Sequence, residues 1–134
     1  MADVMKLQVI TPDRKFYSGD VTMVELTTTE GQVGIYPQHI PMTAIIAPGV
    51  LKIHEEGQVL EAALLSGFLT ILPDKVTIMA ETAEWPDEID YNRAEEAKTR
   101  AERRLSDRGA GAQIDVLRAE MSLKRALVRL EIKD

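Results

Sequence analysis

Cysteine is absent from this chain of 134 residues, which excludes a disulfide framework and a zinc site built from thiolates. No apolar run approaches the roughly 20 residues that a helix needs to cross a bilayer. Residues 1–6 lack the basic and then apolar pattern of a signal peptide. With 45% hydrophobic and 28% charged residues, we expect a cytosolic globular protein with no segment inserted in a membrane.

The motifs of common active sites are absent as well. The sequence contains neither the Gly-x-x-x-x-Gly-Lys phosphate loop nor the Gly-x-Gly-x-x-Gly dinucleotide fingerprint. Its two histidines are far apart: His54 lies on the solvated face of a predicted strand, and His39 lies in a proline-rich loop, where a contact role is favoured over catalysis. We therefore expect a chain that is not an enzyme by itself, with no catalytic residue and no metal ligand.

Acidic and basic residues are unevenly distributed along the chain. Residues 1–89 hold five Lys and Arg against 13 Asp and Glu, a net charge of −8. Residues 90–134 hold 11 Lys and Arg against nine Asp and Glu, a net charge of +2, and eight of the 11 bases are Arg. Arg forms directional bonds to carboxylates and phosphates. The C-terminal part therefore suits an acidic partner or a polyphosphate, whereas the acidic body disfavours nucleic acid.

Residues 4–84 contain short apolar segments interrupted by proline and glycine, which predicts β-strands. Two pairs of segments predict hairpins, around the turns at 55–58 and 73–75. A spacing of about ten residues between strands is typical of a β-sandwich or barrel. The predicted strands occupy residues 7–10, 21–26, 33–36, 50–54, 59–62, 68–72 and 76–80.

Two of the strand segments, 63–65 and 68–72, are apolar on both faces. One face of each must fill the core of the sandwich. The other face is expected to lie under something else, either the second sheet or another protein.

Residues 90–134 contain no proline and have the spacing of two helices. The first ends at Gly109-Ala110-Gly111, and the second begins at about Gln113, which predicts an antiparallel helical hairpin. Such a hairpin is only marginally stable unless it packs on the sandwich or on a partner, and that property suits a switch. The expected apolar stripes are Ala94, Ala97, Ala101 and Leu105 on the first helix, and Ile114, Leu117, Met121 and Leu127 or Leu130 on the second.

Asp90, at the head of the first helix, has two interpretations. It can be an N-cap, whose carboxylate accepts backbone N–H groups. It can also face a nucleotide, with the carboxylate accepting from the adenine amino group and arginines binding phosphate oxygens. The residues alone favour the cap, and the nucleotide site stays an alternative. The arginines that would take part are Arg93, Arg100, Arg125 and Arg129.

A series of motifs runs in order along nearly the whole chain. They occupy residues 9–13, 30–41, 65–69, 73–78, 89–94, 101–105, 118–120 and 123–126. Their order resembles the epsilon subunits of bacterial F-type ATP synthases. The sequence departs from that family at Gln38, where the family often has Gly, and at Gln32, where Glu is common.

The resemblance implies a ten-stranded β-sandwich over residues 1–86 and a mobile, regulatory two-helix hairpin over residues 87–134. It implies a non-catalytic rotor subunit of the central stalk, peripheral on the cytoplasmic face of the bacterial cell membrane. The sandwich would bind the gamma shaft and the c-ring, with Gln32 and His39 as contacts. The hairpin, when extended, would meet the alpha and beta subunits of the catalytic head and block ATP hydrolysis.

The run Ile89-Asp90-x-x-Arg93-Ala94 is similar to the ATP-binding motif of several bacterial members of this family. Four further positions are carried over from the same resemblance: Glu84, Arg100, Arg125 and Arg129. ATP, with or without Mg²⁺, would then be a regulatory ligand that favours the folded hairpin through its differential affinity. Two alternatives to the rotor subunit are a free-standing nucleotide sensor and a small-molecule enzyme built on the sandwich.

Overall fold

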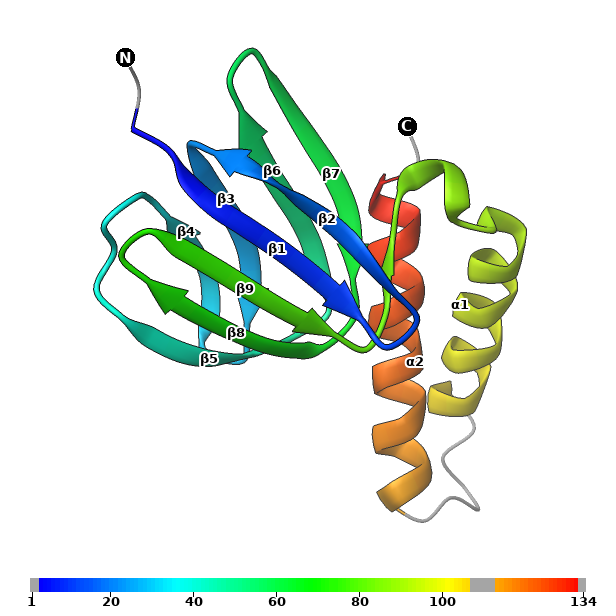
Figure 1. Ribbon diagram of the computed structural model, residues 1–134. Helices are drawn as coiled ribbons and strands as arrows, with labels where there is room; N and C mark the ends of the chain where they lie inside the picture. The colour runs from blue at the N-terminus through cyan, green and yellow to red at the C-terminus, as the bar shows by residue number, and fades with distance from the viewer. Residues whose placement is uncertain (1–2, 107–112, 133–134) are drawn as a thin grey trace.

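The computed structural model describes residues 3–106 and 113–132, and it has the predicted two parts (Figure 1). Ten strands are followed by a short 3₁₀ turn and two helices. The predicted end of the first helix at residues 109–111 lies outside the described residues. The elements are β1 (Met5–Thr11), β2 (Arg14–Val21), β3 (Met23–Thr28), β4 (Gly31–Ile35), β5 (Met42–Ile46), β6 (Gly49–Glu55), β7 (Gln58–Leu64), β8 (Gly67–Leu72), β9 (Lys75–Ala80), β10 (Ala83–Glu84), η1 (Pro86–Glu88), α1 (Tyr91–Ser106) and α2 (Gln113–Ile132).

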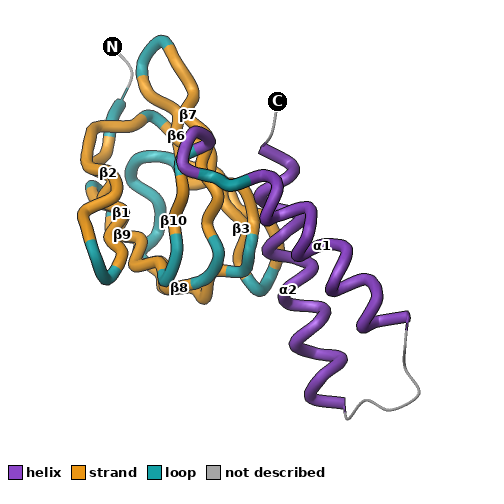
Figure 2. Tube along the Cα trace, turned by 90° about the vertical axis from the view of Figure 1, so that its right-hand side faces the viewer, coloured by secondary structure: helices purple, strands orange, loops and turns teal. Residues whose placement is uncertain are grey.

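The strands form one hydrogen-bonded path that folds into two layers. Its order is β10-β7-β6-β3-β5-β8-β9-β1-β2. Strand β4 lies off this path and pairs with β3 alone. The path passes from one layer to the other where β3 meets β5, through the single pair Thr28–Ile46. Figures 1 and 2 show β1, β8 and β9 in one layer and β3, β6 and β7 in the other. The predicted β-sandwich is therefore confirmed.

Both predicted hairpins are present, as β6–β7 and β8–β9. The residue pattern does not predict β2, β5 or the two-residue β10. In β2 the run Ser18-Gly19-Asp20 interrupts the apolar positions, and only Phe16 and Val21 are buried. The five residues of β5 lie between Pro41 and Pro48, so they resemble part of a loop.

The core of the sandwich is made by alternate residues of nearly every strand, as the pleat of a half-buried strand requires. In β1, for example, Met5, Leu7 and Val9 are buried while the residues between them are not. One strand junction requires glycine: Gly67 has a φ of +149°, and a Cβ there would run into the carbonyl oxygen of Met79. The largest fully buried side chains are Leu7, Val9, Val21, Val24, Ile35, Ile46, Leu51, Ile53, Leu64, Leu69, Ile71 and Ile78.

The two helices lie side by side, and α2 is the one that packs against β6 and β7 (Figure 1). The hairpin is therefore folded against the sandwich in this structure. On each helix two buried alanines are seven residues apart, which places them on one face: Ala94 and Ala101 on α1, Ala119 and Ala126 on α2. Such small side chains allow the helix axes to approach closely, as the narrow stripe of α1 predicts.

The second apolar face of the sandwich is covered at β7. Ala63 and Leu65 form a cluster with Ile89 before α1 and with Val128 and Ile132 at the end of α2. Residues 63–65 are therefore covered as expected, but by the hairpin of the same chain and not by the second sheet or another protein. The corresponding face of β8 is not covered by the described residues, because Phe68 is 57% exposed.

The apolar stripe predicted for α2 is wrong in its extent. Leu117, Met121 and Leu127 are 61%, 38% and 44% exposed. Leu117 and Met121 do share a face with the buried Val128 and Ile132, since they are separated by four and seven residues. They are exposed because the first half of α2 projects beyond the sandwich, as Figures 1 and 2 show. Leu127 lies on a different side of the helix.

Candidate functional site

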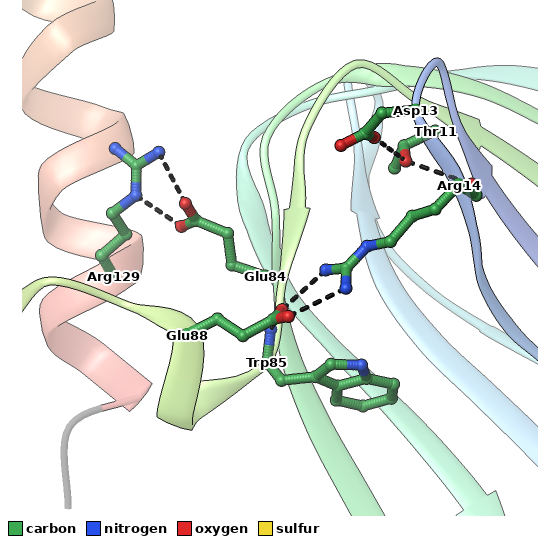
Figure 3. Close-up of polar contacts among 7 residues, drawn as sticks. All are labelled: Thr11, Asp13, Arg14, Glu84, Trp85, Glu88 and Arg129. Carbon is green, nitrogen blue, oxygen red and sulfur yellow. Dashed lines mark hydrogen bonds and ion pairs between the residues drawn. The ribbon is translucent and has the colours of Figure 1, made fainter.

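Residues 84–90, from the end of β10 to the start of α1, form the linker between sandwich and hairpin, and two of its carboxylates form ion pairs with different parts of the molecule (Figure 3). Glu84, in β10, accepts from Nε of Arg129 on α2 at 2.7 Å. Glu88, at the end of η1, accepts from both terminal nitrogens of Arg14 on β2, at 2.7 and 2.9 Å. The paired guanidinium lowers the pKa of Glu88 below its ordinary value.

Trp85 lies between these carboxylates and fixes the linker on the sandwich. Its backbone N–H donates to Glu88 Oε1 at 3.0 Å, and its carbonyl oxygen accepts the backbone N–H of Glu88 at 2.9 Å, so two reciprocal hydrogen bonds close the η1 turn. Its ring stacks on Phe16 of β2, with centroids 4.3 Å apart and planes 15° from parallel. The guanidinium of Arg14 lies 5.0 Å from the centre of the Phe16 ring. Polar and aromatic contacts thus act together to hold the linker on β2.

Asp90 caps α1. Its Oδ1 accepts the backbone N–H of Arg93 at 3.0 Å, and its carbonyl oxygen accepts the N–H of Ala94 at 3.0 Å. The capping interpretation is therefore confirmed. It does not exclude a ligand, because an ionised carboxylate has about four acceptor positions and the cap uses one.

An open pocket of about 360 Å³ lies between the linker, the first turns of α1 and the end of α2. Six of the eight predicted ATP-binding residues line it: Glu84, Asp90, Arg93, Ala94, Arg100 and Arg129. Three further residues complete the lining: Glu88, Glu96 and Ala97. The helical spacing of Glu96 and Ala97 from Arg93 and Arg100 would have indicated these two, whereas Glu88 depends on how the linker folds.

Two predicted residues have other roles in this structure. The side chain of Ile89 is 7% exposed and belongs to the apolar cluster that joins hairpin and sandwich. Arg125 lies one turn before Arg129 on α2, and its guanidinium donates to Ser122 Oγ at 3.3 Å. Neither residue is among those that line the pocket.

The charges of the pocket are partly matched within the protein. Glu84 and Glu88 are already paired, with Arg129 and Arg14. Arg93 and Arg100 are exposed and lie seven residues apart on one face of α1. Between them on this helix, the small side chains of Ala94 and Ala97 leave room for a ligand. Such an arrangement suits an anion with several oxygens, held by forked guanidinium groups.

The two predicted ring contacts lie at separate places on the sandwich. Gln32 is exposed in β4, next to the β3–β4 turn. His39 lies in the β4–β5 loop, at the end of the sandwich away from the hairpin, and its Nδ1 is 2.8 Å from the carbonyl oxygen of Ile40. The residue before it, Gln38, has a left-handed φ of +66°, which explains why glycine suits this position.

His54 is half-buried, and its Nε2 lies 2.6 Å from Glu25 Oε2 on β3. The strand pattern predicts a solvated face for His54. In the structure the side chain pairs instead with Glu25 on the neighbouring strand. In residues 3–106 and 113–132, no three histidine or acidic side chains are grouped to hold a metal ion. No helix within that part of the chain is both long and apolar enough to cross a membrane.

A row of apolar side chains crosses the outer face of the sheet formed by β5, β8, β9 and β1. Ile45 pairs with Phe68, Phe68 with Met79, and Met79 with Ile10. Three of these four side chains are largely exposed: Ile45 at 55%, Phe68 at 57% and Met79 at 60%. A contiguous exposed apolar row of this kind marks an interaction surface.

Comparison with known proteins gives the same division of the chain. Residues 4–86 match the family described as ATP synthase, Delta/Epsilon chain, beta-sandwich domain, and residues 87–134 match its long alpha-helix domain. The ATP synthase epsilon chain of Caldanaerobacter subterraneus is 48% identical over 133 residues, which are 98% of this chain and 95% of that one. The epsilon chain of Halalkalibacterium halodurans is 45% identical over 128 residues, 96% of each chain.

Solved structures share the fold at lower identity. A chain of the Euglena gracilis mitochondrial ATP synthase, in a structure of OSCP, F1 and c-ring, aligns with a TM-score of 0.82 and 21% identity, over 96% of this chain and 79% of that one. A chain from the central stalk and c-ring of the Tetrahymena thermophila enzyme aligns with a TM-score of 0.66 and 12% identity, over 97% and 96% of the two chains. With both domains matched in order and close bacterial relatives over nearly its full length, the chain belongs to the ATP synthase delta/epsilon family.

Proposed function

We propose that the chain is the epsilon-type rotor subunit of a bacterial F-type ATP synthase. It couples proton translocation to ATP synthesis and restrains ATP hydrolysis through its C-terminal helices, without an active site of its own. The observation that carries the proposal is a pair of helices, α1 and α2, docked on the sandwich through a small contact. The membership of the family and the stalk assemblies that contain its structural neighbours support the same role.

The gamma shaft binds the exposed apolar row Ile45–Phe68–Met79–Ile10 in this proposal. Burying such a row excludes water from the joint and makes the sandwich turn with the shaft. Gln32 and the loop that carries His39 face the c-ring. The subunit is then peripheral, at the cytoplasmic face of the cell membrane, and contacts the membrane sector through protein alone.

The hairpin is the regulatory part because its docking is small. In the described part of the chain, a cluster of five buried residues and the Glu84–Arg129 ion pair join it to the sandwich. An element held by so few contacts can be released at low cost. Once released, its basic helices reach the alpha and beta subunits of the catalytic head, where they block the conformational changes of hydrolysis.

ATP is the proposed ligand of the pocket between linker and hairpin. Asp90 accepts from the adenine amino group with the part of its carboxylate that does not cap α1. Arg93, Arg100 and Arg129 bind the phosphate oxygens. Because Glu84 and Glu88 form the linker wall of the same pocket, a ligand that also contacts this wall favours the docked hairpin by its differential affinity for that state.

Reconstitution of the complex tests this function. Complexes are assembled with the full chain or with a chain truncated after Glu88, and their rates of ATP hydrolysis and proton-driven ATP synthesis are compared. We expect the truncated chain to assemble and to sustain synthesis, while hydrolysis rises. Unchanged hydrolysis would remove the inhibitory role, and failure of the full chain to bind the gamma subunit would favour a free-standing ATP sensor.

A further inference from the structure

Glu84 and Glu88 are four residues apart on the linker but are bound to different bodies (Figure 3). We infer that the linker through Glu88 moves with the sandwich and that the hairpin pivots at residues 89–90. The contact that fixes this pivot is the Arg14–Glu88 ion pair. The inference takes from the proposed function only the premise that the hairpin can leave the sandwich.

Two contacts hold the linker on the sandwich, an ion pair of Glu88 and the ring packing of Trp85. Glu88 receives a bidentate ion pair from Arg14, the strongest geometry for such a pair. Trp85 stacks on Phe16 with the rings nearly parallel, and it presents an edge to Tyr17 at 6.4 Å. Within the linker, the reciprocal hydrogen bonds between the Trp85 backbone and Glu88 keep the 3₁₀ turn closed. Loss of the hairpin alone removes none of these contacts.

The hairpin side is held differently. Among the described residues, its contacts are the Glu84–Arg129 ion pair and the apolar cluster in which Val128 and Ile132 cover Ala63, with Tyr91 of α1 packed against it. All of the α2 residues in these contacts lie within 128–132, at the C-terminal end of the helix. Breaking one short segment of α2 therefore releases the hairpin.

Between these two sets of contacts, Ile89 and Asp90 are the only residues that belong to neither η1 nor α1. Ile89 is extended, with φ −82° and ψ 129°. A hydrogen bond from the Tyr91 hydroxyl to the carbonyl oxygen of Pro86 at 3.0 Å spans the joint. Rotation at two residues is sufficient for a hinge, and here the flanking elements are closed by their own caps.

The pivot divides the pocket between two bodies. Glu84 and Glu88 stay with the sandwich, while Arg93, Arg100 and Arg129 leave with the hairpin. Release thus separates the three arginines, which leave together with Asp90 and Glu96, from the carboxylates of Glu84 and Glu88. A ligand that contacts both the arginines and the linker therefore has its complete site only while the hairpin is docked. Arg14 keeps Glu88, on the linker side of that site, bound to the sandwich.

The chain offers clean probes for a test, because it has no cysteine and Trp85 is its one tryptophan. Cysteines introduced at the exposed positions Glu56 and Glu102 take a donor and an acceptor dye, and their energy transfer reports docking. The emission of Trp85 and its quenching by acrylamide report the packing of the linker. The double variant Val128→Asp, Arg129→Gln removes both contacts of α2 in the full chain.

We expect this double variant to lose energy transfer while the emission maximum and the quenching of Trp85 stay at the parent values. A red-shifted, more strongly quenched Trp85 would mean that the linker leaves with the hairpin, which overturns the pivot. Unchanged energy transfer would show that other contacts hold the hairpin, which also overturns it. Neither result depends on ATP or on the assembled complex, so failure here is distinct from failure of the proposed function.

The anchor itself is tested by Arg14→Gln, with Lys15→Gln as the matched control on the same strand. Arg14→Gln should increase the quenching of Trp85 relative to the parent and leave the energy transfer unchanged. Lys15→Gln should change neither. Equal quenching in both variants would show that Arg14 does not anchor the linker.

Discussion

Glu84 and Arg129, 45 residues apart in the sequence, form an ion pair at 2.7 Å in which each side chain is 26% exposed. This pair joins the last strand of the sandwich to the last turns of the hairpin. It also lines the pocket assigned to ATP. Docking of the hairpin and binding of a ligand therefore depend on the same guanidinium.

The ion pair should contribute measurably to docking. We expect Arg129→Gln and Glu84→Gln each to lower the fraction of docked hairpin, since each leaves one partner without its counterion. Combined in a double-mutant cycle, they should show a coupling energy of about 1 kcal/mol, the upper range for a partly exposed pair. The measurement is energy transfer between dyes on the sandwich and on α1. Strict additivity would show that the pair does not stabilise the docked state.

The apolar contact should depend on the end of α2 and not on its beginning. Ile132 is 7% exposed against the sandwich, so Ile132→Ala should weaken docking by about 2 kcal/mol, the low end for such a truncation near a terminus. Leu117, 61% exposed on the same helix face, is the matched control, and Leu117→Ala should change docking by less than about 0.5 kcal/mol. Equal effects in urea titrations of docking would contradict the placement of the contact.

Acid should loosen the linker. The ion pair lowers the pKa of Glu88 from its ordinary 4.5, so its stabilising effect is complete above that pH and is lost as the pH falls through the lower pKa of the folded chain. Acrylamide quenching of Trp85 should stay constant down to about pH 4.5 and then rise. In Glu88→Gln the quenching should be high at every pH. Asp13→Asn, which removes the neighbouring carboxylate, should keep the transition, and a transition lost in that variant would assign it to Asp13 instead.

Asp90 can be separated into its two roles by two substitutions. Asp90→Ala removes the cap and should destabilise α1 by about 1 kcal/mol. Asp90→Asn keeps a side-chain oxygen for the Arg93 N–H and should leave helix stability within a few tenths of 1 kcal/mol. If the carboxylate accepts from adenine, Asp90→Asn should nonetheless weaken ATP binding. Circular dichroism and ATP titration of both variants distinguish these outcomes, and undiminished ATP binding by Asp90→Asn would leave Asp90 a cap alone.

Local patterns predict much of the fold. The hairpins β6–β7 and β8–β9 follow from apolar runs around turn residues, and the start of α2 at Gln113 agrees with the structure. The face of α2 was harder to predict, because its buried residues include the small Ala119 and Ala126 whereas the larger Leu117 is exposed. Residue size indicates which face is apolar, but only the reach of the sandwich decides how much of that face is covered.

The site was predictable only where its residues lie close together in the sequence. Asp90 and Arg93 lie three residues apart at a helix start, so a sequence pattern can join them. Arg14 and Glu88 are 74 residues apart, and nothing local links them. Their pairing depends on β10 bringing the linker alongside β7, with Trp85 reaching Phe16 of β2.

Calorimetric titration of ATP into the full chain, alongside Arg93→Gln and the control Arg118→Gln on the outer side of α2, tests the central claim most directly. We expect saturable binding by the parent and by Arg118→Gln. Arg93→Gln should bind roughly ten- to a hundredfold more weakly, the effect of losing a charged hydrogen bond. No binding heat at about 1 mM ATP, or equal affinity in Arg93→Gln, would contradict a nucleotide site between linker and hairpin.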